Sequence, residues 1–298
     1  MSILLDRSNR VLVQGITGQM GMFFVDDARK YGTQIVAGVS PGRSGTMVRD
    51  VPVYASVRAA REATGADTAM VFVPPAAVLG AAVEAIEGGC KLVVATADEM
   101  PVLDAIEVRA AARANGAVFV GPNTPGLISP GKAKMGFMPS FCYIQGNVGV
   151  ISRSGSLSYE GSKRLTIAGI GQSTVIGIGG DPVKGTTAAE ALELFQRDPE
   201  TKAVLYLGEI GGSEELFVAE YAARGGAKPV AALIVGHTAP PGKKMGHAAA
   251  LIGSKAEGHA AKQKLLRDAG VFVAAGLSQV VESMQHALAS GMKTAAAA

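Results

Sequence analysis

The sequence predicts an α/β protein of two domains, each built on a parallel sheet, and three observations support this class. Short apolar runs rich in Val and Ile alternate with longer segments of helical pattern along most of the chain. A stretch rich in Pro and Gly, residues 130–147, interrupts the alternation near the middle. The length of 298 residues suits one domain of ordinary size on each side of that stretch. Continuous apolar strands separated by helices are typical of parallel sheets covered on both faces.

The first domain is predicted over residues 1–129. Its expected strands are, in chain order, RVLVQG (10–15), TQIVAGV (33–39), TAMVFVP (68–74), KLVVAT (91–96) and AVFVGP (117–122). Helices are expected at residues 20–32 and 76–89, because each segment is long, carries recurring apolar positions and ends in Gly.

Residues 130–147 are interpreted as an interdomain connection, and the second domain is predicted over residues 148–298. Its expected strands are VGVIS (148–152), QSTVIGIG (172–179), AVLYLGEI (203–210), PVAALIVG (229–236) and VFVAAG (271–276). The small residues that follow His247 are expected to begin a helix.

Composition excludes several classes of function. The net charge is only +3 and no dense run of Lys and Arg occurs, which argues against a general nucleic-acid surface but not against a local anion pocket. Cys90 and Cys142 are far apart, so neither a disulfide nor a metal site is expected, and a cytoplasmic location fits. No run of about 18 apolar residues predicts a membrane span, and the charged N-terminus does not resemble a signal peptide.

The first candidate anion site is a Gly-rich turn between a predicted strand and helix. Gly15, Gly18 and Gly21 allow a tight turn and close backbone approach, and free N–H groups at the helix start attract phosphate. A tight turn in any α/β domain explains the pattern equally well. At the end of the second strand, an NAD site usually has an acidic residue, whereas this chain has Arg43. Arginine suits the ribose phosphate of CoA or NADP, although a solvated loop charge is the simpler interpretation.

The second candidate anion site follows VGVIS. Ser154, Gly155 and Ser156 are expected at a helix start, where serines often serve only as N-caps. Together with Arg153 they exceed what one cap needs, which favours an anion site. Glu209 follows a buried strand at the edge of the sheet where α/β sites form, with capping or a salt bridge as the alternative role.

His247 lies in a loop rich in Gly and Pro after another predicted strand. A lone histidine is usually a surface or packed residue. Here a carboxylate, a Ser/Gly helix start and a Lys-bearing loop are expected at the same sheet edge. A carboxylate that holds one ring nitrogen leaves the other as a nucleophile, and a helix N-terminus receives phosphate charge. The pattern therefore predicts a phosphoryl-carrying histidine. His237 is the competitor without an assigned role, and contact of Lys243 and Lys244 with phosphate or with solvent stays open.

Seven motifs occur in the order and approximate spacing of one family: GITGQMG, GVSPGRSG, GPNTPGLISPG, VGVISRSGSLSYE, GQSTVIGIGGDPVKG, GEIGG and GKKMGHA. The chain resembles the α subunit of succinyl-CoA synthetase (succinate–CoA ligase) over nearly its whole length. The resemblance implies a Rossmann-like CoA-binding domain at residues 1–129 and a flavodoxin-like ligase domain at residues 148–298 that carries the phosphohistidine.

The resemblance also implies roles for individual residues. His247 would be the phosphorylated histidine and Glu209 the residue that orients it, with Tyr159 near the acid substrate. Ser154, Gly155 and Ser156 would bind the phosphate. The implied CoA contacts are Gly15, Thr17, Gly18, Gln19, Met20, Arg43, Thr96, Ala97 and Asp98.

The implied partner is a β subunit of ATP-grasp fold, in a heterodimer or an α2β2 assembly. That subunit would bind ATP or GTP with Mg²⁺. The implied reaction joins succinate to CoA through an acyl phosphate and a phosphorylated His247, with release of ADP or GDP and phosphate, as in the tricarboxylic acid cycle.

The chain departs from the family pattern at several positions near the expected CoA and acid sites. Arg43 stands for Lys, Thr124 for Cys, Asp98-Glu99 for Glu-Gly, SFCYIQG (140–146) for GHIHKPG and Ala249 for Gly. These departures leave malate, a sulfonated acid or another small acid open as the substrate. Two other classes also remain: a non-catalytic CoA-sensing module, and an NADP-dependent oxidoreductase for which no hydride-transfer pattern is present.

Overall fold

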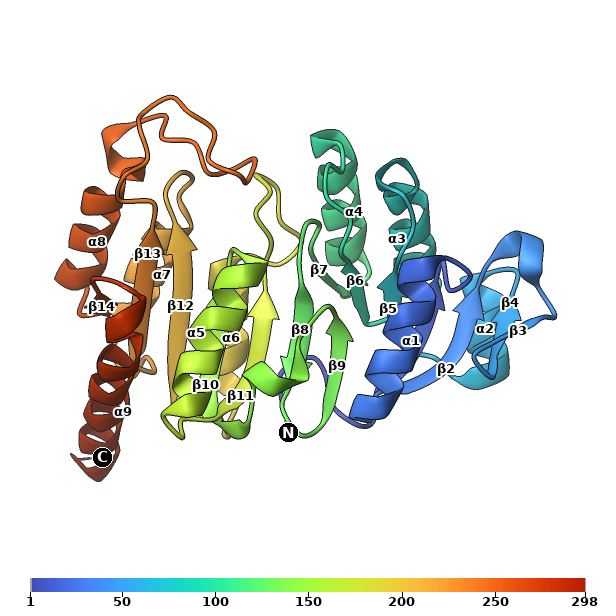
Figure 1. Cartoon of the computed structure of the whole chain (residues 1–298), viewed down its shortest axis with the longest axis horizontal. Coiled ribbons are helices and arrows are strands. Elements are labelled where there is room, and N and C mark those ends of the chain that lie inside the picture. The colour runs from blue at the N-terminus through green and yellow to red at the C-terminus, as the bar shows by residue number, and fades with distance from the viewer. Residues whose placement is uncertain (1, 298) are drawn as a thin grey trace. The chain divides into compact units, whose positions relative to one another are not determined.

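The computed structural model describes residues 2–297, with the side chains of residues 2–291 (Figure 1). The chain divides into two compact units. The N-terminal unit comprises residues 4–138 with 183–186, and the C-terminal unit comprises residues 139–182 and 187–297 with residues 2 and 3. None of the helices within the described residues is long and apolar enough to span a membrane.

The N-terminal unit alternates strands and helices as the sequence predicts. Its elements are β1 (Arg10–Gln14), α1 (Gln19–Tyr31), β2 (Gln34–Val39), η1 (Pro41–Arg43), β3 (Met47–Val48), β4 (Val51–Tyr54), α2 (Val57–Thr64), β5 (Thr68–Val71), η2 (Pro75–Ala77), α3 (Val78–Glu87), β6 (Leu92–Ala95), α4 (Val102–Ala114), β7 (Val118–Val120), β8 (Gly126–Ser129) and β9 (Ala133–Gly136). The sheet order is β3-β4-β2-β1-β5-β6-β7. The five predicted strands are β1, β2, β5, β6 and β7, and they pair in parallel.

The short edge strands β3 and β4 were not predicted. β3 has two residues and β4 carries Pro52, which removes a backbone donor and is tolerated only near a sheet edge. The core of the unit lies between the sheet and its helices, where strand and helix residues such as Val71, Val78 and Val93 are fully or almost fully buried. This burial on both faces explains why the strands read as continuous apolar runs.

The C-terminal unit repeats the architecture. Its elements are η3 (Ser140–Cys142), β10 (Gln145–Ser152), α5 (Gly155–Ile167), β11 (Gln172–Gly177), α6 (Ala188–Arg197), β12 (Ala203–Glu209), α7 (Glu214–Ala222), β13 (Val230–Val235), η4 (Lys255–Glu257), α8 (His259–Asp268), β14 (Phe272–Ala274), η5 (Leu277–Gln279) and α9 (Val280–Ala297). Its five parallel strands lie in the order β14-β13-β12-β10-β11. The predicted α/β class with parallel sheets is confirmed in both units.

Residues 130–147, expected as a connection, are themselves folded. They contain β9, η3 and the first three residues of β10. β8 and β9 form an antiparallel hairpin in which a Cβ on Gly126 would lie 2.0 Å from the carbonyl oxygen of Met135. Gly146, which resembles loop punctuation in the sequence, is likewise required by close strand approach, because a Cβ there would lie 2.3 Å from the carbonyl carbon of Gly171.

Each sheet has a switch point where the chain order reverses. β1 lies between β2 and β5, and β10 lies between β12 and β11. Ligands of open α/β sheets bind outside the carboxyl ends of strands at such points. Both candidate sites follow strands that flank a switch point.

Candidate functional site

The N-terminus of α5 lies at the switch point of the C-terminal sheet. Ser154 follows β10 in extended conformation and caps the helix, but its Oγ is 3.5 Å from the Leu157 amide that it accepts from. The same Oγ lies 3.4 Å from the exposed Ser156 hydroxyl. Because the cap is long, the two hydroxyls and the first amides of the helix are suited to receive an anion.

Glu209 and His247 meet at the same sheet edge. Glu209 ends β12, and Nδ1 of His247 lies 2.8 Å from its Oε2 and 3.1 Å from its Oε1. The Glu209 side chain is 8% exposed and that of His247 is 28% exposed. The histidine is therefore held by a largely buried carboxylate while its ring still reaches solvent.

Gly180 provides the surface on which the His247 ring lies. A Cβ at Gly180 would come within 2.5 Å of the ring Cγ. The Gly180 carbonyl also accepts from the Ala249 amide at 3.2 Å. Any side chain at position 180 would displace the ring, so the loop after β11 shapes the histidine site.

The prediction of a helix directly after His247 is wrong. Residues 247–254 form no helix, and α8 begins at His259. A Cβ on Gly211 would lie 2.1 Å from the Ala249 carbonyl oxygen, and the Gly211 amide donates to the carbonyl of Glu257 at 3.0 Å. The segment after His247 is thus packed as a loop across the turn that follows β12, and this contact overrides the local preference of its alanines.

The hydrogen bond to Glu209 determines what the ring can do. When Nδ1–H donates to the carboxylate, Nε2 carries the lone pair and is the nucleophilic nitrogen. Bond formation at Nε2 places positive charge on the ring, and the adjacent carboxylate stabilises that charge. The arrangement suits transient capture of an electrophilic group such as a phosphoryl group.

Arg153 has a different place from the one expected. Its side chain is 1% exposed and does not project to the helix start as part of an anion pocket. Instead its Nη1 donates to the carbonyl oxygens of Glu209 at 3.1 Å and Gly211 at 2.8 Å. Arginine beside a Ser/Gly turn reads as an anion ligand, but here the burial of the strand end directs it to the interior.

Sequence reasoning missed three further residues around Glu209. Glu215 and Lys262 form a buried ion pair, and the Tyr206 hydroxyl donates to Glu215 at 2.9 Å. Burial lowers the pKa of the Lys262 ammonium, and the neighbouring Glu215 carboxylate opposes that shift. No local signal could have found Lys262, since a lysine on a helix normally lies on the solvated face.

The Gly-rich turn of the N-terminal unit lies at its own switch point. Gly15 has a φ of +78°, and a Cβ there would lie 2.3 Å from the Phe72 carbonyl oxygen. A Cβ on Gly21 would lie 2.5 Å from the Gly15 carbonyl oxygen. Packing therefore explains these two glycines. Gly18 is exposed and occupies the N-cap position of α1. Because glycine has no side chain to cap the helix amides, the start of this helix is open to a ligand.

The other expected CoA residues follow neighbouring strands. Arg43 is exposed in η1 after β2, and Thr96 to Asp98 follow β6 with increasing exposure. Thr17, Gln19 and Met20 flank Gly18 at the start of α1 and are half-buried or exposed. Since β2, β1, β5 and β6 are parallel neighbours, these residues share one edge of the sheet.

Other residues named from the sequence have less specific surroundings. Tyr159 is half-buried in α5, and burial raises the pKa of its hydroxyl. Lys243 and Lys244 are exposed. His237 is exposed and lies with its ring centroid 5.9 Å from that of His259.

Comparison with known proteins covers both units. A family model described as a CoA binding domain matches residues 6–98, and one described as a CoA-ligase matches residues 151–272. The α subunit of succinate–CoA ligase (ADP-forming) from Aquifex aeolicus is 45% identical over 290 residues, covering 97% of this chain and 95% of that protein. The α subunit 1 of the corresponding Archaeoglobus fulgidus enzyme is 46% identical over 288 residues, covering 97% and 99%.

Solved structures share the fold at lower identity. ATP citrate lyase from Methanothrix soehngenii, in complex with citrate and coenzyme A, matches with a TM-score of 0.87 at 22% identity, over 98% of this chain and 52% of that chain. The dinucleotide-forming acetyl-coenzyme A synthetase 1 of Ca. Korarchaeum cryptofilum matches with a TM-score of 0.75 at 21% identity, over 92% and 59%. This chain spans little more than half the length of those longer chains, and the likeness concerns the fold.

Proposed function

Because the chain belongs to the succinate–CoA ligase α-subunit family, we propose that it is the phosphoryl-carrying half of a nucleoside-diphosphate-forming acid–CoA ligase. The overall reaction converts succinate, CoA and ATP or GTP to succinyl-CoA, ADP or GDP, and phosphate. The names of the relatives favour ADP as the product.

One observation carries the proposal: Nδ1 of His247 lies 2.8 Å from the Glu209 carboxylate at the sheet edge where α5 begins. The Nε2 lone pair attacks the terminal phosphorus of the nucleotide, the N–P bond forms, and the P–O bond to the departing diphosphate breaks. Glu209 stabilises the charged ring. Ser154, Gly155 and Ser156 bind the transferred phosphoryl oxygens at the helix start.

The second half of the reaction releases the phosphoryl group from His247. A carboxylate oxygen of succinate attacks phosphorus, and the N–P electron pair returns to Nε2. The thiolate of CoA then attacks the acyl carbon and expels phosphate. Tyr159 is the proposed neighbour of the acid.

CoA binds to the N-terminal unit in this proposal. The match of residues 6–98 to a CoA binding domain supports it. The turn from Gly15 to Met20 would receive the pyrophosphate, and Arg43 the ribose phosphate, because backbone amides and guanidinium groups both bind phosphate well. Thr96, Ala97 and Asp98 would line the same edge.

A β subunit supplies the nucleotide site with its Mg²⁺. The relatives are named as α subunits, which supports a hetero-oligomer. Cys90 and Cys142 are buried and form no disulfide, which suits the reducing conditions of the proposed cytoplasmic location.

Labelling of the complex with ATP radioactive at the γ position tests the proposal. Wild type is expected to gain acid-labile label, and His247→Asn to gain none. His237→Asn is the matched control because it changes the other histidine of the same loop, and it should label as wild type. Equal labelling of His247→Asn and wild type would overturn the assignment.

A panel of acids tests the substrate. Succinate should give the highest rate of thioester formation, with malate and a sulfonated acid as comparisons. A higher kcat/KM for one of these would keep the reaction class and replace the acid.

A further inference from the structure

Four charged side chains form a buried cluster beneath the histidine site. The side chains of Arg153, Glu209, Glu215 and Lys262 are between 1% and 8% exposed, and all belong to the C-terminal unit. Two cations face two carboxylates, so the cluster is neutral as a whole. Buried charges persist only when each has a partner, so every member is constrained by the others.

Arg153 and Lys262 both donate hydrogen bonds to the backbone of the turn at the end of β12. Arg153 Nη1 donates to the carbonyl oxygens of Glu209 and Gly211 at 3.1 and 2.8 Å. Lys262 Nζ donates to the same two oxygens at 3.0 and 2.6 Å. These carbonyls lie on either side of Ile210, where β12 ends. These four hydrogen bonds therefore fix the backbone from which the Glu209 side chain projects.

The turn that Arg153 and Lys262 hold also contacts the loop that carries His247. Gly211 has a φ of +78°, and a Cβ there would lie 2.6 Å from the Leu251 amide nitrogen. The backbones of the turn and the loop thus touch closely. Movement of the turn would displace both Glu209 and the segment that follows His247.

Arg153 also contacts the Glu209 carboxylate itself. Its Nη2 lies 3.2 Å from Oε1, whereas His247 Nδ1 is nearest to Oε2 at 2.8 Å. His247 Nδ1 also lies 3.1 Å from Oε1, so the guanidinium and the imidazole both contact the carboxylate. A carboxylate without this second partner could rotate away from the ring.

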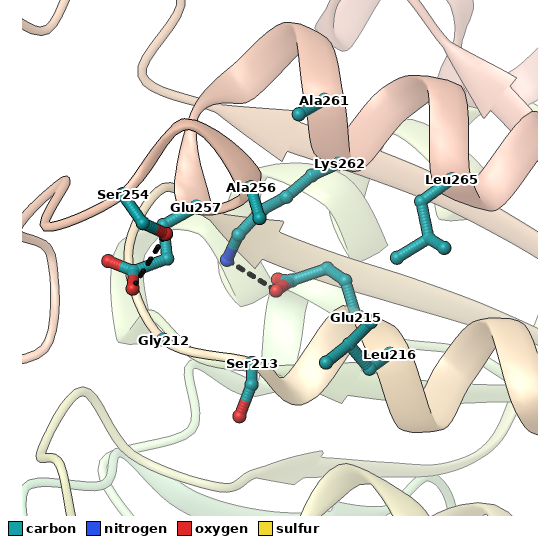
Figure 2. A pocket seen from close by; sticks show the side chains of 10 residues that line it. All are labelled: Gly212, Ser213, Glu215, Leu216, Ser254, Ala256, Glu257, Ala261, Lys262 and Leu265. Carbon is teal, nitrogen blue, oxygen red and sulfur yellow. Dashed lines mark hydrogen bonds and ion pairs between the residues drawn. The ribbon is translucent and has the colours of Figure 1, made fainter.

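Lys262 has no remaining N–H group with which to donate a hydrogen bond to a ligand. Its three N–H groups are accounted for by the Glu209 carbonyl, the Gly211 carbonyl and the Glu215 carboxylate. The Lys262–Glu215 pair borders a cavity of about 350 Å³, and Figure 2 shows the ammonium directed at Glu215. The geometry thus directs Lys262 toward the turn and its carboxylates rather than toward a molecule in the cavity.

We infer that Arg153 and Lys262 are positioning residues that hold Glu209 as an oriented carboxylate against His247. The inference rests on the proposed phosphoryl transfer at His247. Loss of Lys262 leaves two buried carboxylates facing one cation, and one carboxylate then takes up a proton at higher pH than before. A protonated Glu209 stabilises the charged ring less, so phosphorylation would fail first at low pH.

The test uses the purified complex with its β subunit and follows the rate of His247 labelling across pH 5.5 to 9. Lys262→Met keeps most of the side-chain volume but removes the charge. We expect labelling at neutral pH to fall roughly 10- to 100-fold, with the acid limb of the pH profile displaced upward by about one unit. The KM for CoA should stay unchanged, because CoA is assigned to the other unit.

Two companion variants separate positioning from simple loss of structure. Lys262→Arg restores the charge and should return the acid limb to its wild-type position. Lys264→Met removes an exposed lysine of the same helix, paired with Asp268, and should leave rate and profile unchanged. Uniform slowing of Lys262→Met at every pH without rescue by Lys262→Arg would overturn the inference, as would wild-type labelling of Lys262→Met.

Arg153→Lys tests the second cation. It tests the inference on its own if Lys262→Met does not assemble with the β subunit. It keeps the charge but loses the planar fork, so labelling should slow without displacement of the acid limb. Labelling at the wild-type rate would overturn the inference for Arg153. Absence of label from wild type itself would overturn the proposed function, an outcome distinct from any of these.

Discussion

A single glycine decides where the His247 ring can lie. The ring rests against Gly180, where a Cβ would come within 2.5 Å of Cγ. Its Nδ1 then meets Glu209, a residue 38 positions earlier in the chain. The position of the ring thus depends on the absence of a side chain at Gly180 and on the carboxyl group of Glu209. Sequence motifs identify Glu209 and His247, but nothing local indicates that Gly180 lies beneath the ring.

Gly180→Ala should lower the rate of His247 labelling roughly 10- to 100-fold, because the added methyl group displaces the ring from Glu209. The unfolding midpoint should change little, since His247 lies on a partly exposed loop. Gly225→Ala is the matched control: a Cβ there meets nothing within 4 Å. Labelling of Gly180→Ala at the wild-type rate would show that the ring can find its partner in another position.

The two thiols should resist modification in the native chain. Burial raises the pKa of the Cys90 thiol to about 12 and also raises that of Cys142. The reactive thiolate is therefore scarce at pH 8. Titration with a chromogenic disulfide reagent should give almost no rapid reaction natively and two thiols per chain in denaturant. Rapid reaction of native Cys90 would contradict its buried position.

At the scale of elements, two helix starts in the C-terminal unit differ in what their caps do. Thr187 caps α6 through a reciprocal capping box with Glu190. Ser154 caps α5 through one long hydrogen bond of 3.5 Å. The first cap is a stabilising device, whereas the second leaves the helix start suited to bind an anion. The sequence shows Ser154 as an ordinary N-cap candidate, and the length of its cap bond is known only from the structure.

Thr187→Ala should lower the free energy of unfolding by about 1–2 kcal/mol, because it removes a complete cap. Ser154→Ala should cost less than about 0.5 kcal/mol, near the low end for weak caps, yet slow the labelling of His247. Denaturant unfolding and labelling of both variants check that Thr187→Ala loses more stability, whereas Ser154→Ala slows the labelling of His247. A larger stability loss for Ser154→Ala would assign that serine to the cap alone.

The segment that carries His247 ends at α8, which begins with the partly buried His259. Burial lowers the pKa of His259 below its ordinary value of 6.5, and His237 and Arg267 add to this, while the hydrogen bond to the Ile234 carbonyl opposes it. A lowered folded-state pKa means that the unfolded chain binds the proton more readily. The stabilising contribution is therefore present above about pH 6.5 and is lost as pH falls through the lowered pKa.

His259→Gln should make the free energy of unfolding less dependent on pH below about 6.5. Urea unfolding of wild type and variant at several pH values between 5 and 8 measures this. An unchanged slope in the variant would show that other groups cause the acid sensitivity.

At the scale of the whole molecule, two units of similar architecture carry different tasks in the proposed function. The N-terminal unit presents an open helix start at the β1 switch point, and the C-terminal unit presents Glu209 and the α5 N-terminus at the β10 switch point. The same α/β geometry thus creates a helix start suited to an anion twice, because parallel strands direct helix N-termini to one edge of each sheet.

CoA should slow hydrogen exchange in the N-terminal unit alone, around residues 15–20 and 96–98. Saturation at about 100 times Kd would add about 2.7 kcal/mol to the stability of the unit that binds it. Hydrogen-exchange mass spectrometry of the full chain with CoA or NADPH checks this. Protection by NADPH but not by CoA would favour the oxidoreductase alternative.

The sequence by itself determined the α/β class and all ten main parallel strands, and it predicted the residue types of two candidate anion sites. Strands buried on both faces must be continuously apolar, so the pattern is local and readable. Only the tertiary structure decided that residues 130–147 are folded, that no helix follows His247, and that Arg153 and Lys262 surround Glu209. Those features depend on contacts between distant segments: Lys262 is 53 residues from the carbonyl it holds. A charged side chain is buried only where another part of the chain supplies its partner, and local sequence cannot specify that partner.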